Sequence, residues 1–360
     1  MGATPVKFQV LGTHEPTSWY ETLSHFSEKD VYFLPEYHRA HELNGDGVAR
    51  AFVAEEGNEL LFYPFLVRPI HCPETELTRE NWNDIETVYG YSGPLCTSTN
   101  PAFLAAAWKA FSEWCQQERI VAEFIRFNPF LNCQRYMSGP YHVELDRETV
   151  ALRLDASESA LWSGYSSVHR NMVRKAVTRG LKCGEVSPTE GQETFKQIYF
   201  EAMDQVRAHP YYYFSDAYFN HLCNALGENL RLFTVRNQDQ LVAAALFLQY
   251  GESLHYHLAA NNKSGKESAA ANLLLHTVAQ WGSKRGLRWL HLGGGRTPDP
   301  KDSLLRFKSH ISAFRLPFYT GKRIHDHDVY NKLCSKWMLE SGLPTKPNYF
   351  LLYRLEQEVS

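Results

Sequence analysis

The chain has 360 residues, of which 44% are hydrophobic and 14% aromatic, so it is long enough for two domains with well-filled cores. Its net charge of −3 argues against a uniformly basic nucleic-acid binder, and no apolar run approaches the roughly 18 residues of a membrane-spanning helix. The N-terminus lacks the apolar segment of a secretory signal, so we expect a cytoplasmic protein.

The first half of the chain alternates strand-like and helix-like segments. Strands are expected where hydrophobic residues alternate or cluster between turn residues, and a proline at position 101 favours the start of a helix. The predicted elements are, in order, a helix at 17–26, strands at 48–54 and 60–67, a strand that runs into a Gly/Pro turn at 87–95, a helix at 101–119 and a strand at 121–127.

The second half repeats this order after a strand-like segment at 141–153 and a helical segment at 157–180. The repeated order is a hairpin, a strand, a turn, a helix and a strand, which predicts an internal structural duplication. The predicted elements are strands at 230–236, 241–249 and 253–259, a helix at 269–285 and a strand at 288–292. We place the domain boundary near residue 150, giving domains 1–150 and 151–360.

Several enzyme classes lack their signature motifs in this sequence. The chain has no phosphate-binding P-loop, no Rossmann glycine motif, no His-Glu-x-x-His and no Gly-x-Ser-x-Gly. The seven cysteines form no Cys-x-x-Cys pair, and His255 and His257, at strand spacing, are more typical of structural or pocket-lining residues than of metal ligands. We therefore expect no disulfide framework, no metal site and no tightly bound cofactor.

Basic residues are unevenly distributed along the chain. Residues 263–323 contain twelve Lys and Arg against three acids, and a second basic cluster lies at 170–182. This asymmetry suits a groove for a phosphate-bearing ligand such as CoA, a nucleotide sugar or the acceptor end of a tRNA, but not sequence-specific DNA binding. The alternative interpretation is two solvated helix faces.

Three further segments combine residues that suit ligand binding. The loop at 261–268 leads into a helix whose N-terminus would favour phosphate, although an ordinary capped helix start fits equally. Three glycines follow Leu292, where they either permit close approach of a ligand or form a flexible turn. A tyrosine triplet at 211–213 suits a sugar-like or peptide-like acceptor, or a structural cluster.

Together these residues resemble the branch of the GNAT acyltransferase superfamily that includes the FemX-type aminoacyltransferases and the BioF2-like proteins. The resemblance covers essentially the whole chain. It is carried by Tyr32-Phe-Leu-Pro-Glu-Tyr, Val88-Tyr-Gly-Tyr-Ser-Gly-Pro-Leu, Phe124-Ile-Arg-Phe-Asn-Pro, Tyr165-Ser-Ser-Val-His-Arg-Asn-Met-Val-Arg-Lys-Ala, and Leu292-Gly-Gly-Gly through Arg306-Phe-Lys.

The resemblance implies an α/β (α+β) protein with two tandem GNAT-like domains, each a mixed, mostly antiparallel sheet flanked by helices. It also implies transfer of an acyl or aminoacyl group to an amine of a cell-envelope precursor, with acyl-CoA or aminoacyl-tRNA as co-substrate. The acceptor would be a small molecule or a lipid- or nucleotide-linked precursor. The sequence departs from the family in lacking the coiled-coil arm of several tRNA-dependent members and in keeping only one glycine in the CoA loop.

Site residues follow from the resemblance and from the chemistry of amine acylation. Lys308 and the backbone of a splayed strand near 247–250 would stabilise the oxyanion, and a proton acceptor is required. The catalytic candidates are Lys308, His257, His291 and Asp299. The donor-binding candidates are Phe247, Leu248, Lys263, Gly265, Lys266, Ser268, Gly293, Gly294, Gly295, Arg296 and Arg306. The acceptor-binding candidates are Arg170, Asn171, Lys175, Arg207, Tyr211, Tyr212 and Tyr213.

Two other functions fit the same sequence. One is a CoA-dependent N-acyltransferase that makes a small specialised metabolite. The other is a non-catalytic module that binds a nucleotide-linked sugar, which tight binding without turnover would indicate. The sequence predicts no particular oligomeric state.

Overall fold

The computed structural model describes residues 6–70 and 81–355, which form two compact units. The first unit comprises Met1–Leu145 with Phe318–Ser360, and the second comprises Asp146–Pro317. The chain passes between the units within β7 (His142–Arg153) and β13 (Arg315–Ile324). Within the described parts of the chain, no helix has both the length and the apolar character needed to span a bilayer. Cys72 lies outside the described residues.

The first unit is built on a mixed sheet with strand order β1-β2-β3-β4-β6-β13, and β5 pairs with β3 beside it. Only the β4–β6 pair in this part of the sheet is parallel. The strands are β1 (Lys7–Gly12), β2 (Val48–Glu56), β3 (Glu59–Pro69), β4 (Asn83–Glu86), β5 (Leu95–Cys96) and β6 (Ile120–Arg126). The main helices are α1 (Pro16–Ser24), α2 (Pro35–Asn44), α3 (Pro101–Gln117) and α11 (His327–Ser341).

Strand β3 is buried on both faces, which explains its nearly continuous hydrophobic sequence. Successive side chains of a strand point to opposite faces of the sheet. Phe62 therefore packs against Trp19 of α1, with ring centroids 5.5 Å apart. Its neighbour Tyr63 packs against Trp108 of α3 at 5.6 Å. The sheet of the first unit is thus covered by aromatic side chains on both faces.

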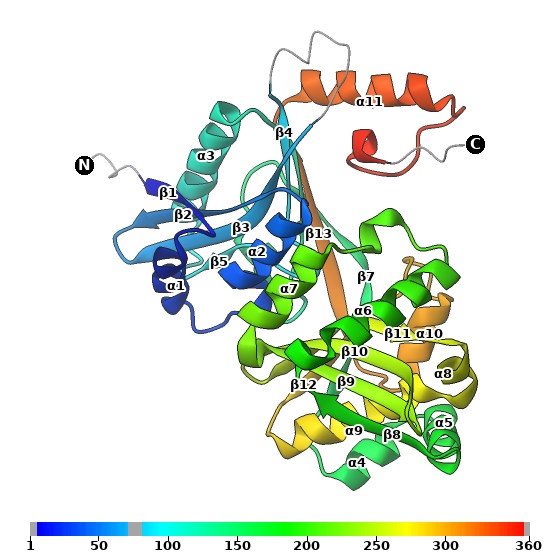
Figure 1. Cartoon of the computed structure of the whole chain (residues 1–360). Helices are drawn as coiled ribbons and strands as arrows, with labels where there is room; N and C mark the ends of the chain where they lie inside the picture. The colour runs from blue at the N-terminus through cyan, green and yellow to red at the C-terminus, as the bar shows by residue number, and fades with distance from the viewer. Residues whose placement is uncertain (1–5, 71–80, 356–360) are drawn as a thin grey trace. The chain divides into compact units, whose positions relative to one another are not determined.

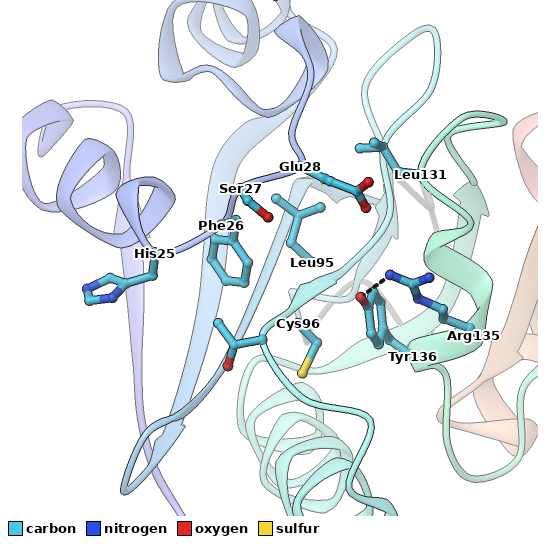
Figure 2. Close-up of a pocket in the computed structure, with 10 residues that line it drawn as sticks. His25, Phe26, Ser27, Glu28, Leu95, Cys96, Leu131, Arg135 and Tyr136 are labelled. Carbon is cyan, nitrogen blue, oxygen red and sulfur yellow. Dashed lines mark hydrogen bonds between the residues drawn. The ribbon is translucent and has the colours of Figure 1, made fainter.

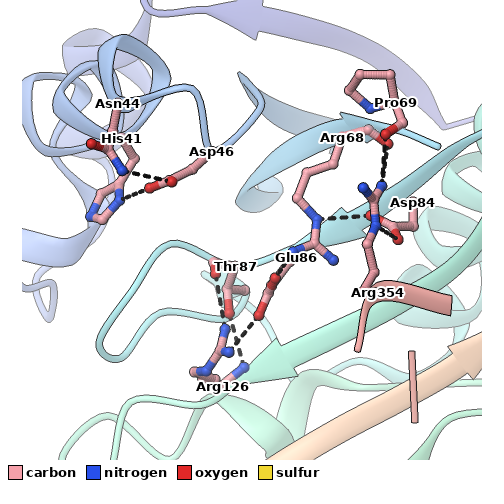
Figure 3. A network of polar contacts seen from close by, with 10 residues as sticks. All are labelled: His41, Asn44, Asp46, Arg68, Pro69, Asp84, Glu86, Thr87, Arg126 and Arg354. Atoms are coloured by element: carbon pink, nitrogen blue, oxygen red, sulfur yellow. Dashed lines mark hydrogen bonds and ion pairs between the residues drawn. The ribbon is translucent and has the colours of Figure 1, made fainter. Parts of the chain in front are cut away.

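A buried ion-pair network joins strands of the first unit to its C-terminal segment (Figure 3). The fully buried carboxylate of Asp84 accepts hydrogen bonds from Arg68 and from Arg354, each at 2.8 Å. Glu86 pairs with Arg68 and Arg126. Burial acts to raise the pKa of Glu86, but the two guanidinium groups outweigh it and hold that pKa below its ordinary value.

This network shows why the strand predicted to run from residue 87 into a Gly/Pro turn is misplaced, although the turn itself is present. The strand lies earlier, at β4, because Asp84 and Glu86 are charged residues whose partners are supplied by neighbouring segments rather than by the local sequence. Gly90 and Gly93 then adopt φ angles of +111° and +106°, which end the extended chain.

The second unit has the strand order β7-β12-β11-β10-β9-β8, with the β11–β12 pair parallel. Its strands are β8 (Leu181–Val186), β9 (Leu230–Asn237), β10 (Gln240–Tyr250), β11 (Ser253–Asn261) and β12 (Trp289–Gly293), besides part of β7. Its helices are α4 (Glu158–Gly164), α5 (Ser167–Thr178), α6 (Pro188–Gln205), α7 (Asp216–Ala225), α8 (Lys263–Ser268), α9 (Ala270–Lys284) and α10 (Ser303–Ser309). The helix predicted at 157–180 is thus two helices.

Helices cover both faces of this sheet, with α6 and α7 on one and α4, α5 and α9 on the other (Figure 1). On the α9 face, Phe233 and Phe247 share a core with Leu274. On the α6 face, Gly191 approaches Leu232 so closely that a Cβ atom would lie 2.4 Å from its methyl group. Successive side chains of β9 therefore point to different helix layers, Leu232 toward α6 and Phe233 toward α9.

The predicted duplication is confirmed by strand pairing as well as by element order. In each unit a hairpin (β2–β3 or β9–β10) is followed by an antiparallel strand (β4 or β11). A helix then leads to a parallel partner of that strand (β6 or β12). The predicted fold class, a mixed α/β protein with two similar halves of sheet and flanking helices, is that of the structure.

The compact units differ from the predicted domains in the placement of residues 318–360. These residues belong to the first unit, where the His325 backbone N–H donates to the Val121 carbonyl at 2.8 Å and α11 packs on β6. Whether 1–150 and 151–360 behave as separate folding domains stays a prediction.

We predict that Asp84→Asn lowers the free energy of unfolding by about 3–5 kcal/mol, because it leaves two half-buried arginines without the buried carboxylate that they share. Urea denaturation measures the change. The control is Glu113→Gln, whose exposed pair with Lys109 spans 3.9 Å and contributes at most about 0.5 kcal/mol. Equal effects of the two substitutions would contradict the structural role of Asp84.

Candidate active site

The pairing between β11 and β12 ends in the middle of β11. The last matched pair is His255 with His291, although β11 continues to Asn261. We call the divergence of the two strands beyond this pair the fork. At the same place the register between β10 and β11 shifts: Phe247 is matched with Tyr256 and Leu246 with Leu258, so His257 is the inserted residue of a β-bulge. A bulge frees backbone groups from the sheet ladder, so the fork offers them to a ligand.

The strand that diverges from its neighbour is therefore β11. The sequence had placed the splayed strand near 247–250, which lies in β10. Phe247 and Leu248 are fully buried. Phe247 is matched with Arg231 on one side and Tyr256 on the other, so β10 is held between two strands. A strand in the middle of an antiparallel ladder cannot open, whereas β11 borders a strand reached through a helical crossover.

His257 is held at the bulge by a tyrosine that sequence reasoning missed. Its Nε2 lies 3.0 Å from the hydroxyl of Tyr218, a fully buried residue of α7. The Tyr218 ring stacks on Phe214 with centroids 4.4 Å apart, which fixes its position. Because α7 and β11 are separated in the chain, the sequence pattern does not indicate this contact. A histidine fixed by a hydroxyl group is suited to proton transfer.

His291, in contrast, is a buried structural residue. Its Nε2 lies 2.9 Å from the hydroxyl of Thr149, and its Nδ1 lies 3.3 Å from Nδ1 of His255. Burial, followed by the charges of His255 and Lys308, lowers the pKa of His291 well below its ordinary value, so the ring is neutral. Because both ring nitrogens already have partners, His291 is a poor base for an incoming amine.

Lys308 lies in α10 with its amine buried. Its Nζ donates a hydrogen bond to the carbonyl of Gly294 at 2.7 Å, and the residue is 6% exposed. Burial lowers the pKa of Lys308 to about 7, partly opposed by the carboxylate of Asp302. Near neutral pH the amine therefore exists in both protonation states, a property common among catalytic lysines.

The three glycines after Leu292 have structural causes. Gly293 has a φ angle of +74°. A Cβ atom on Gly294 would lie 3.2 Å from the Glu148 carbonyl, and one on Gly295 would lie 2.7 Å from Asp302 Oδ1. Asp302, which the sequence did not single out, also caps α10 by accepting from the amides of Leu304 and Leu305. The loop therefore holds α10, and with it Lys308, against the end of β12.

The other candidates around this loop lie on the surface. Arg296, Asp299 and Arg306 are exposed. The Asp299 carboxylate accepts from the backbone of Lys301 at 2.8 Å, so it caps a turn. Its assignment as a base, like the donor assignments of the two arginines, stays a prediction.

The predicted phosphate loop is folded as helix α8. Asn262 caps this helix by accepting from the Gly265 amide at 2.8 Å. Gly265 is required by packing, because a Cβ atom would lie 2.2 Å from the Val242 carbonyl. Ser268 is buried and donates to the Ser264 carbonyl at 2.6 Å. Lys263 and Lys266 remain exposed for contacts with a charged donor.

The predicted acceptor residues fall into two separate groups. Arg170, Asn171 and Lys175 lie on α5, which packs against α9, and Arg170 donates to carbonyls at the end of α4. Arg207 and Tyr211–Tyr213 lie in the connection between α6 and α7, on the other face of the sheet (Figure 1). Tyr211, Tyr212 and Tyr213 are each between 38% and 39% exposed. The structure therefore does not bring the two groups together.

The second group lies near the predicted donor helix. Lys266 of α8 donates to Oε1 of Gln205 at 3.2 Å, and Gln205 ends α6 two residues before Arg207. Arg207 has a φ angle of +47°, a sparsely populated backbone conformation for a non-glycine residue. The α6–α7 connection and α8 thus lie next to each other.

Comparisons with known proteins agree with this arrangement. Residues 167–308 match the family model described as acetyltransferase (GNAT) domain, a segment that contains Tyr218, His257 and Lys308. The resemblance to the GNAT superfamily read from the sequence is confirmed. No curated protein sequence matches the chain.

Solved structures of similar fold cover most of the chain. FemX is 15% identical, with a TM-score of 0.66 over 91% of this chain and 99% of its own. The C-terminal domain of a protein described as a lysylphosphatidylglycerol synthetase from Agrobacterium fabrum is 12% identical, with a TM-score of 0.56 over 91% and 96%. A tandem GNAT protein from the clavulanic acid biosynthesis pathway is 10% identical, with a TM-score of 0.51 over 88% and 98%. These identities establish a shared fold alone.

We predict that Lys308→Met is more stable than the wild type at pH 7. The pKa of Lys308 is about 7 in the folded protein and 10.5 as its ordinary value, so the unfolded chain binds more protons between these values. Burial of Lys308 therefore destabilises the fold most at and below pH 7, and this effect disappears as the pH approaches 10.5.

Urea denaturation from pH 7 to pH 9.5 should show the advantage of Lys308→Met shrinking as the pH rises. Lys109→Met, at an exposed position of α3, should show no such pH dependence. A variant less stable than the wild type at every pH would mean that the hydrogen bond to Gly294 outweighs the burial of the amine.

Proposed function

We propose that this chain is a transferase that moves an acyl or aminoacyl group to the amine of a cell-envelope precursor, either an amino sugar or a peptide. The observation that carries the proposal is the fork. A bulged strand, a fixed histidine and a buried lysine amine are combined within the segment that matches an acetyltransferase domain.

The transfer is direct, without a covalent enzyme intermediate. In the reaction, the amine nitrogen bonds to the acyl carbon, and the C–S or C–O bond to the donor breaks. The amine loses a proton to a base, and the leaving group takes one up. The two described cysteines of the second unit support a direct route, because burial raises the pKa of Cys183 to about 12 and of Cys223 to about 11. Neither supplies a thiolate nucleophile at neutral pH.

We assign one task to the bulge backbone and Lys308 and another to His257. The backbone at the bulge and the Lys308 ammonium stabilise the negative oxygen of the tetrahedral intermediate. His257, held by Tyr218, accepts the proton of the attacking amine. Placing donor and acceptor in one site supplies the remaining acceleration.

The donor is either an acyl-CoA or an aminoacyl-tRNA. The acetyltransferase match supports acyl-CoA. The side-chain cap on α8 favours aminoacyl-tRNA over acyl-CoA. The Asn262 side chain already accepts a hydrogen bond from the Gly265 amide, which the pyrophosphate of CoA would otherwise use. Exposed Lys263 and Lys266 suit either phosphate-bearing molecule. For the acceptor, Arg207 and the exposed tyrosines offer hydrogen bonds and stacking to a sugar or peptide.

The first experiment is calorimetric titration with acetyl-CoA, with CoA and with a mixture of charged tRNAs at two salt concentrations. Micromolar CoA binding identifies an acyl-CoA enzyme, and steeply salt-dependent binding of charged tRNA identifies an aminoacyltransferase. Transfer to each member of a panel of amino sugars and peptides is then measured by the release of the donor's leaving group. Failure to bind either donor class would overturn the proposal.

Lys308→Met is expected to lower kcat by about 10²–10³-fold while binding of the donor stays close to wild type, because the interaction forms chiefly in the transition state. Lys109→Met serves as the matched control and should retain wild-type turnover. Wild-type kcat in Lys308→Met would exclude the assigned role of this lysine.

Tyr218→Phe is expected to lower kcat by about tenfold, because His257 loses its hydroxyl partner. The KM for the donor should change little. Tyr349→Phe, an exposed tyrosine of the first unit, is the control. Wild-type kcat in Tyr218→Phe would exclude a role of this hydroxyl in holding His257 for catalysis.

A further inference from the structure

The first unit contains a cavity of about 280 Å³ that takes no part in the proposed reaction. It lies between the segment after α1, the short strand β5 and a turn that ends in the 3-10 helix Cys133–Tyr136 (Figure 2). This volume is close to the lower limit of ligand pockets, about 300 Å³. The cavity is therefore suited to a small ligand.

Opposite charges line this cavity. Arg135 and Glu28 both extend into the space between the segments (Figure 2). Among the described residues, none forms a hydrogen bond or an ion pair with the Glu28 carboxylate. The two groups nevertheless interact electrostatically. The pKa of Arg135 is raised chiefly by the hydrogen bond to Tyr136, and the charge of Glu28 also contributes to this rise. A cation and an anion thus line the same cavity without an ion pair between them among the described contacts.

The position of Arg135 is fixed in advance of any ligand. Its guanidinium lies over the Tyr136 ring, 4.7 Å from the centroid, and donates to the Tyr136 hydroxyl. Tyr136 is itself held, because its carbonyl accepts from the buried indole of Trp108 at 2.7 Å. A guanidinium held in this way loses little conformational entropy when it binds a carboxylate.

The remaining side chains indicate binding rather than covalent chemistry. Cys96 lines the cavity, but burial raises the pKa of its thiol to about 11, so it is protonated at neutral pH and unreactive. Ser27 contributes an exposed hydroxyl, and Phe26 and Leu95 contribute apolar surface. The cavity therefore offers one cation, one anion, a hydroxyl and a small apolar wall.

We infer that this cavity binds a small zwitterion, an α-amino acid or the end of a short peptide, with its carboxylate on Arg135 and its ammonium on Glu28. A ligand with both charges satisfies the two side chains at once, whereas an ion of either sign satisfies one and faces repulsion from the other. This site belongs to the first unit alone and does not depend on the proposed transfer reaction.

The test is NMR-monitored titration of the full chain with L-alanine and L-alanyl-L-alanine. N-acetyl-L-alanine, which lacks the ammonium, and L-alaninamide, which lacks the carboxylate, are the matched probes. The zwitterions should shift signals of residues around Arg135 and Glu28, and each capped probe should bind at least about tenfold more weakly. Arg135→Gln and Glu28→Gln should each weaken zwitterion binding by a similar factor.

Arg135→Lys keeps the charge and serves if Arg135→Gln fails to fold, as judged by its melting temperature; it should bind more tightly than Arg135→Gln. Glu113→Gln, on exposed α3, should bind as the wild type does. The inference is overturned if neither zwitterion binds up to about 10 mM. It is equally overturned if the capped probes bind as well, or if Glu28→Gln leaves the affinity unchanged.

Discussion

The parallel ladder between β11 and β12 ends after the buried pair His255 and His291, and the candidate active site depends on this limit. Up to that point the two rings, together with Thr149, satisfy one another's polar atoms inside the sheet. Beyond it, the bulge at His257 removes backbone groups from pairing. A sheet that continued to pair there would lack the bulge on which the proposed stabilisation of the oxyanion rests.

Lys308 connects α10 to the glycine loop. Because its amine donates to Gly294, the loop that leaves β12 and the helix that follows are held together by the same group that is assigned to catalysis. Burial that lowers its pKa also destabilises the folded chain, which is a common conflict between activity and stability at active sites. Asp302 compensates in part, as it caps α10 and lies beside the buried amine.

The two units repeat one pairing scheme but use it differently. In the second unit the parallel pair opens at the fork, whereas in the first the corresponding pair, β4 with β6, lies beside the ion pairs of Asp84 and Glu86. Arg354 extends that network to the C-terminal segment, so residues far apart in sequence stabilise one sheet. The parallel pair of the second unit thus diverges at the fork, whereas the parallel pair of the first unit lies beside ion pairs. The cavity of the first unit near Arg135 lies elsewhere, beside β5.

The sequence by itself determined the duplicated order of elements and the GNAT resemblance, and it named Lys308 as a candidate, because hydrophobic periodicity and local motifs are properties of neighbouring residues. It placed the splayed strand at Phe247 instead of at His257, since a bulge depends on how two strands pair. It also missed Tyr218, Thr149 and Asp302, whose contacts join elements separated in the chain. Only the tertiary structure decided these, and it gave Lys308 its lowered pKa, because burial is set by packing and not by local sequence.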